Sequence, residues 1–116
     1  MSEQYHAIMA HAVIMLEASW MKNAINAIAY REGDAWIAQG IEYDIVAQAD
    51  ELIALPDAFE RAVLENIRIT EHLGRKPLEG IKSAPPRFLE MFESAKIEVR
   101  ATNQRGAAAV AVRVAA

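Results

Sequence analysis

The spacing of apolar residues changes near residue 50, and this change most constrains the fold. Between residues 23 and 49 apolar residues form short runs separated by polar turns, which is typical of strands in antiparallel hairpins. Between residues 55 and 73 they recur at helical spacing, which predicts a helix with one apolar face. This order predicts an α+β protein in which a long helix covers one face of a small sheet.

Three strands are expected in the first of these segments. The apolar runs Asn23–Tyr30 and Ala35–Ile41 flank a polar turn that contains Gly33, as in a β-hairpin. After a second polar break, Glu42–Asp44, the run Ile45–Ala49 has side chains of alternating character. We therefore expect a three-stranded antiparallel meander.

The long helix is expected over Leu55–Leu73. Pro56 suits the first turn of a helix, where its missing N–H costs nothing, and Asp57 lies near the positive end of the helix dipole. Gly74, followed by Pro77, is a stop signal. The complete prediction for this part of the chain is the order β-β-β-α.

A shorter helix and one or two strands are expected after the connector Arg75–Pro86. Apolar residues at helical spacing predict the helix over Pro86–Ala95, and residues 97–102 alternate as in a strand. The valines at 110, 112 and 114 alternate with small residues, which predicts a last strand, with a frayed alanine-rich tail as the alternative. We assign residues 75–116 to the same domain as residues 21–74.

The first 20 residues have two interpretations. Gln4–Trp20 favours a helix by composition, because it is rich in Ala and Met and lacks Gly and Pro. Such a helix would dock on the sheet or on another subunit. Met21, however, opens a segment that looks like a natural start, so residues 1–20 are alternatively an upstream, non-native extension.

Composition limits the classes of function. The 116 residues suit one domain, and the absence of cysteine excludes disulfides and Cys-based zinc sites. The net charge of −4 argues against a dedicated DNA-binding protein. The apolar N-terminal stretch lacks a basic start and is short for a membrane span, so we expect a cytoplasmic protein without a membrane segment.

Residues 21–51, MKNAINAIAYREGDAWIAQGIEYDIVAQADE, resemble the start of HicB-like antitoxin domains. The shared features are an opening Met-Lys with an apolar strand, an acidic-Gly turn, an aromatic residue in the next strand, and acidic residues near the third strand. Here the aromatic residue is Trp36 and the acids are Asp44 and Asp50. Ala49 replaces the usual Gly before the last acid, and Leu52–Ala54 are additional residues before the helix. The resemblance covers residues 21–74.

The resemblance implies a degraded RNase H-like fold that forms dimers or larger homo-oligomers. Paired members of the family cover a small ribonuclease toxin, HicA. Many also carry a DNA-binding region after the domain, and no convincing version follows Gly74 here. The expected partner is therefore a HicA-like toxin, whereas DNA binding is not expected.

The candidate chemical residues favour structural roles. An RNase H-like nuclease needs carboxylates that converge on two metal ions, and the candidates are Asp34, Asp44, Asp50 and Glu65. Acids at predicted turns and helix starts are expected for backbone reasons. The histidines lack the spacing of a metal pair on a helix, and Ser-His-Asp and phosphate-loop motifs are not indicated. We assign no catalytic, cofactor-binding or metal-binding residue and expect no enzyme.

The leading hypothesis is a protein-binding module that sterically covers a partner. Its predicted contacts are Trp36, Tyr43, Asp44 and Asp50. If the partner is a HicA-like toxin, its RNA-binding face is basic and would meet the acidic residues Glu42, Asp44, Asp50 and Glu51. The alternatives are an orphan oligomeric domain, a relic metal-dependent nuclease and a nucleic-acid-binding regulator.

Overall fold

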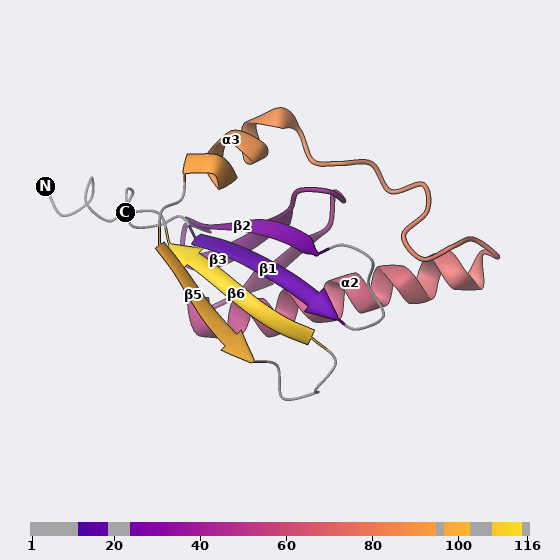
Figure 1. Cartoon of the computed structure of the whole chain (residues 1–116), viewed down its shortest axis with the longest axis horizontal. Helices are drawn as coiled ribbons and strands as arrows, with labels where there is room; N and C mark the ends of the chain where they lie inside the picture. The colour runs from indigo at the N-terminus through magenta and orange to yellow at the C-terminus, as the bar shows by residue number, and fades with distance from the viewer. Residues whose placement is uncertain (1–11, 19–23, 95–96, 103–107, 115–116) are drawn as a thin grey trace, which may run out of the picture.

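The computed structural model describes residues 12–18, 24–94, 97–102 and 108–114, which form an antiparallel sheet with a long and a short helix (Figure 1). The sheet contains six strands in the order β4-β3-β2-β1-β6-β5. The strands are β1 (Ala12–Ala18), β2 (Ile25–Glu32), β3 (Ala35–Gly40), β4 (Val46–Ala49), β5 (Ile97–Thr102) and β6 (Ala108–Val114). The helices are the 3-10 turn η1 (Leu52–Ala54), α2 (Leu55–His72) and α3 (Pro86–Ser94). The predicted α+β class is confirmed.

The strands β2, β3 and β4 form the expected meander. Glu32 pairs with Ala35, so only Gly33 and Asp34 lie between β2 and β3. Gly33 has φ of 63°, and a glycine with positive φ at the first position suits a two-residue hairpin turn. At the other end of β3, only glycine fits at position 40, because a Cβ there would overlap the carbonyl oxygen of Tyr43.

The helix predicted over Gln4–Trp20 is wrong for Ala12–Ala18, which form strand β1. β1 pairs with β2 on one side and with β6 on the other, so it lies inside the sheet. Residues 1–11 and 19–20 lie outside the described residues. The weak helix preference of Ala, Met and Leu is overridden because pairing on both sides satisfies the strand's main chain and buries Ile14 and Leu16.

The main core lies between the sheet and α2. Alternate residues of β1, including Ile14 and Leu16, are buried on this face together with Phe59 and Val63 of α2. Alanines such as Ala27 and Ala38 supply the small side chains opposite the helix, which allow it to lie close to the strands. The helix contacts β4, β3 and β1.

The boundaries of α2 follow the expected signals. Pro56 lies in the first turn, and Asp57 forms an exposed ion pair with Arg61 at 3.3 Å. The helix ends at His72, and Gly74 follows with φ of 76°. The predicted helix Leu55–Leu73 is therefore confirmed to within one residue.

A smaller core lies on the opposite face of the sheet, under α3. Val13 and Ile28 point to this face, and Ile41 and Phe88 are buried against them. Figure 1 shows α3 on the other side of the sheet from α2. Since α3 contacts β2, it covers the middle of this face, whereas Val46 of β4 on the same face is 53% exposed.

The two C-terminal strands extend the sheet beyond β1. β6 pairs with β1 along its whole length, and β5 pairs with β6 at the edge. They lie where the sequence predicts C-terminal strands, at residues 97–102 and 108–114. None of the helices in the described ranges is long and apolar enough to cross a membrane.

Candidate functional site

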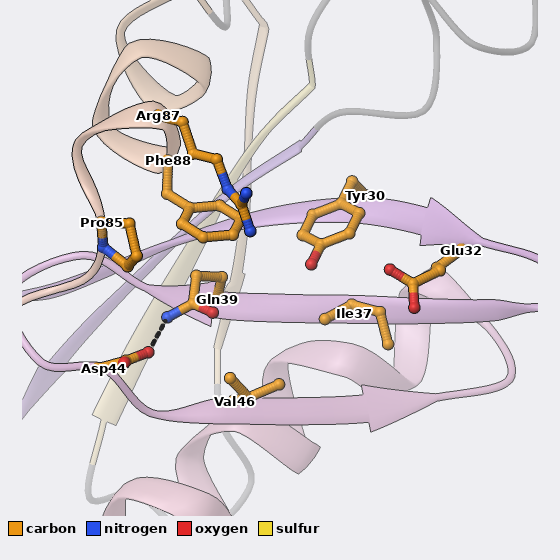
Figure 2. Close-up of a pocket in the computed structure, with 9 residues that line it drawn as sticks. All are labelled: Tyr30, Glu32, Ile37, Gln39, Asp44, Val46, Pro85, Arg87 and Phe88. Carbon is orange, nitrogen blue, oxygen red and sulfur yellow. Dashed lines mark hydrogen bonds between the residues drawn. The ribbon is translucent and has the colours of Figure 1, made fainter.

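A groove of about 370 Å³ lies on the α3 face of the sheet, beside the edge strand β4 (Figure 2). We call it the edge groove. Residues of β2, β3 and β4 form its floor, and the start of α3 forms one wall, as Figure 2 shows. Its lining residues are Tyr30, Glu32, Ile37, Gln39, Asp44, Val46, Pro85, Arg87 and Phe88.

Aromatic side chains and an arginine build the α3 wall of the edge groove. The rings of Tyr30 and Phe88 are stacked, with centroids 6.1 Å apart and planes 23° apart. The guanidinium carbon of Arg87 lies 4.6 Å from the centroid of the Phe88 ring. Burial and the nearby Glu32 carboxylate raise the pKa of the Tyr30 phenol, and the positive charge of Arg87 partly offsets this.

A polar link closes one end of the edge groove. The buried side chain of Gln39 donates a hydrogen bond from Nε2 to Oδ1 of Asp44 at 2.7 Å (Figure 2). The main-chain N–H of Asp44 donates to the carbonyl oxygen of Lys82 at 2.6 Å. The loop before β4 is therefore fixed both to β3 and to the connector that leads to α3.

The strand β4 leaves hydrogen-bonding groups at the edge of the sheet. It is the last strand in the sheet order, and among the described strands it pairs only with β3. The Gly40 N–H donates to the Ile45 carbonyl, and in an antiparallel pair alternate residues bond to the same neighbour. Ala47 therefore bonds toward β3, whereas the main-chain groups of Val46 and Gln48 point outward.

The edge groove and the strand edge meet at Val46. Its side chain lines the groove and is 53% exposed. Ile37, which belongs to the neighbouring strand β3, lies beside it on the groove floor (Figure 2). An incoming strand would thus find main-chain partners at the edge and an apolar surface on the adjoining face.

Two of the predicted contact residues, Trp36 and Tyr43, lie on the α2 face, away from the edge groove. Both are partly buried against the main core. The guanidinium carbon of Arg31 lies 5.8 Å from the centroid of the Trp36 ring. The aromatic residues noted in the sequence thus mainly pack against the core.

The other two predicted contacts, Asp44 and Asp50, flank strand β4. Both are exposed, and Asp44 also lines the edge groove. Glu42, another predicted acidic contact, is engaged within the chain. Its two carboxylate oxygens accept hydrogen bonds from the main-chain N and from Nδ2 of Asn26, each at 2.7 Å. Glu42 is thus exposed but bound to Asn26 within the chain.

The candidate metal ligands do not converge. Asp34 lies in the turn between β2 and β3, whereas Glu65 is exposed on α2. Within the described ranges, no group of three or more His, Asp or Glu side chains could hold a metal ion. His72 is exposed in the last turn of α2, and His6 and His11 lie outside the described residues.

Sequence reasoning missed the edge groove and one buried acid. Tyr30, Gln39 and Arg87 come together only because α3 folds back over β2, and no local sequence pattern reports that contact. Glu60, in the first part of α2, is only 2% exposed. The available signal was its position two helical turns before Ile67, which is partly buried against the main core.

The edge groove lies in a strongly acidic part of the chain. Residues 32–60 contain eight of the chain's 16 Asp and Glu residues and none of its 12 Lys and Arg residues. The eight acids are Glu32, Asp34, Glu42, Asp44, Asp50, Glu51, Asp57 and Glu60. This segment includes β3, β4 and the start of α2, so the free edge lies in the most acidic part of the chain.

Comparison of the chain with family models, with curated proteins and with solved structures found no match.

Proposed function

We propose that this chain is a HicB-like protein-binding module that neutralises a small, basic ribonuclease toxin by covering its active surface. The mechanism is steric, and no residue of this chain performs chemistry. The proposal includes a homo-oligomeric state and a cytoplasmic location, as expected for an antitoxin of this kind.

One observation carries the proposal: the meander β2-β3-β4 is followed by a long helix on one face of the sheet. This is the order of elements that the resemblance of residues 21–74 implies. The edge of β4, which among the described strands pairs only with β3, and the acidic segment around it are further support, because a ribonuclease toxin has a basic RNA-binding face.

The test is co-purification from the native host, followed by an activity assay. The tagged full-length chain is recovered from its host's lysate, and mass spectrometry identifies the associated proteins. We expect a small basic protein in stoichiometric amount. That protein alone should cleave RNA, and an equimolar amount of this chain should abolish the cleavage.

Two results would contradict the proposal. Recovery of the chain only with itself, as a stable oligomer, would indicate an orphan domain without a toxin partner. A co-purified protein whose RNA cleavage is unchanged by the chain would exclude neutralisation. Light scattering of the purified chain tests the homo-oligomeric state separately.

A further inference from the structure

We propose that the edge of β4 binds an extended segment of a partner protein, which adds to the sheet as a seventh, outer strand and carries basic residues at both ends. This inference rests on the proposed protein-binding function and names the surface and the chemistry of the partner. It involves the main chain of Val46 and Gln48, the edge groove, and the acids that flank β4.

The main chain provides the first part of the argument. The N–H and C=O groups of Val46 and Gln48 point away from β3, at the edge of the sheet. Natural proteins protect such edges with Lys, Pro or a bulge. Strand β4 has the sequence VAQA, which contains neither Lys nor Pro. An extended peptide can therefore pair with it directly.

The edge groove provides the second part. A strand paired with β4 would place alternate side chains on the α3 face, next to Val46. Val46 and Ile37 offer an apolar floor there, and Phe88 lies in the wall beyond them (Figure 2). The groove would thus receive small or β-branched apolar side chains of the partner.

Charge determines which occupant fits. Asp44 precedes β4, and Asp50 and Glu51 follow it, so both ends of the exposed strand are acidic. Glu32 adds a fourth carboxylate at the end of the groove near the β2–β3 turn. Two basic residues lie near this edge: Lys82, whose carbonyl oxygen accepts the hydrogen bond from the Asp44 N–H, and Arg87, which lines the α3 side of the groove. The partner segment complements this edge when its ends are basic.

A second copy of this chain fits the edge poorly. Two β4 strands that pair symmetrically must place outward-pointing residues opposite each other, and the register with the greatest overlap places Val46 of each copy opposite Gln48 of the other. This register places Asp44 of each copy opposite Asp50 of the other. Like charges directly opposite one another destabilise a strand pair, and here the repulsion occurs twice.

The binding experiment uses a defined probe and the full-length chain. The probe is a fluorescent peptide of five alternating Val and Thr residues with two Lys residues at each end. Fluorescence anisotropy should show binding that weakens as salt increases. A peptide with Glu in place of Lys should bind at least about tenfold more weakly. A Lys peptide that is N-methylated at alternate residues keeps its charge but loses strand donors, and it should also bind at least about tenfold more weakly.

Two pairs of variants test the surface on the chain itself. Gln48→Pro removes an outward N–H without removing a bond to β3 and should weaken binding of the Lys peptide about tenfold, whereas Gln48→Thr should not. The double variant Asp50→Asn/Glu51→Gln should weaken binding and reduce its salt dependence. Its matched control, Glu90→Gln/Glu93→Gln, removes the same charge from exposed positions on α3. Thermal melting confirms that each variant is folded.

Three results would overturn the inference. If the N-methylated peptide bound as tightly as the unmethylated Lys peptide, the binding would be charge attraction without strand pairing. If the Lys peptide did not bind, the edge of β4 would not be available to an added strand. Dissociation of an oligomer by Gln48→Pro would show that a second copy occupies β4. The proposed function fails separately: toxin neutralisation that survives Gln48→Pro would refute only the edge inference, whereas peptide binding without a ribonuclease partner would refute only the antitoxin role.

Discussion

At the scale of single residues, polar side chains fix the segments that local preferences leave undetermined. The bond from Gln39 to Asp44 fixes the loop before β4. Thr70 does the same for the connector after α2. Its hydroxyl donates to the Ile67 carbonyl at 2.9 Å and accepts a hydrogen bond from the Leu78 N–H at 3.0 Å. Leu78 has φ of 65° and is buried in the main core, so this one hydroxyl supports a strained main-chain conformation at a packed position.

Substitution of Thr70 tests this role. Thr70→Val preserves the shape of the side chain but leaves the buried Leu78 N–H without its partner. We expect a loss of about 1–3 kcal/mol in the free energy of unfolding, measured by urea denaturation. Thr70→Ser keeps the hydroxyl and should lose less. Equal stability of Thr70→Val and the native chain would show that the bond to Leu78 contributes nothing.

At the scale of elements, the sequence predicted what depends on local spacing and missed what depends on distant contacts. The hairpin turn at Gly33 and the helix boundaries at Pro56 and Gly74 were predictable, because each depends on the conformational limits of one residue. Strand β1 was not, because its residues favour helix and form a strand only between β2 and β6. The edge groove likewise exists only because α3 packs on β2, far from it in sequence.

The ionisation of Tyr30 reports on the packing of α3 against β2. The pKa of the Tyr30 phenol is raised in the folded chain, so the neutral phenol is favoured by folding. This contribution to stability is complete below the usual phenol pKa, and it is lost as the pH rises through the pKa of the folded chain. In ultraviolet titration at 295 nm, the signal removed by Tyr30→Phe should therefore have its midpoint above the usual phenol value. The stability difference between the native chain and Tyr30→Phe should shift in favour of the variant at high pH.

Charge variants separate the causes of that raised pKa. Glu32→Gln should lower the pKa of Tyr30, and Arg87→Gln should raise it further, because the two charges act in opposite directions. Glu90→Gln, an exposed substitution on the same helix as Arg87, serves as the control and should leave it unchanged. An unaltered Tyr30 titration in Arg87→Gln would contradict the placement of α3 beside β2.

At the scale of the whole molecule, the sheet joins the two ends of the described chain. β1, the first described strand, lies between β2 and β6, and β6 is the last. The meander β2-β3-β4 therefore forms only half of a larger sheet. The helices divide its two faces unequally: α2 contacts β4 on one face, whereas on the other face α3 contacts β2 and Val46 of β4 is 53% exposed. The edge strand β4 is therefore partly accessible on the α3 face, and the strand order separates it from β1 by β3 and β2.

The position of β1 makes the fold of residues 21–116 dependent on the segment before Met21. A chain that starts at Met21 lacks Ile14 and Leu16 from the main core and Val13 from the smaller one. Full burial of each such side chain contributes about 1.5–3 kcal/mol, and the net stability of a domain is only about 5–15 kcal/mol. We expect the shortened chain to lose cooperative unfolding in circular dichroism, and the full-length variant Ile14→Ala to lose about 2–5 kcal/mol. If the shortened chain melts at the native temperature, residues 1–20 are an appended extension and β1 is dispensable. If both chains behave as expected, β1 is an integral strand, and any natural form of this domain must include it.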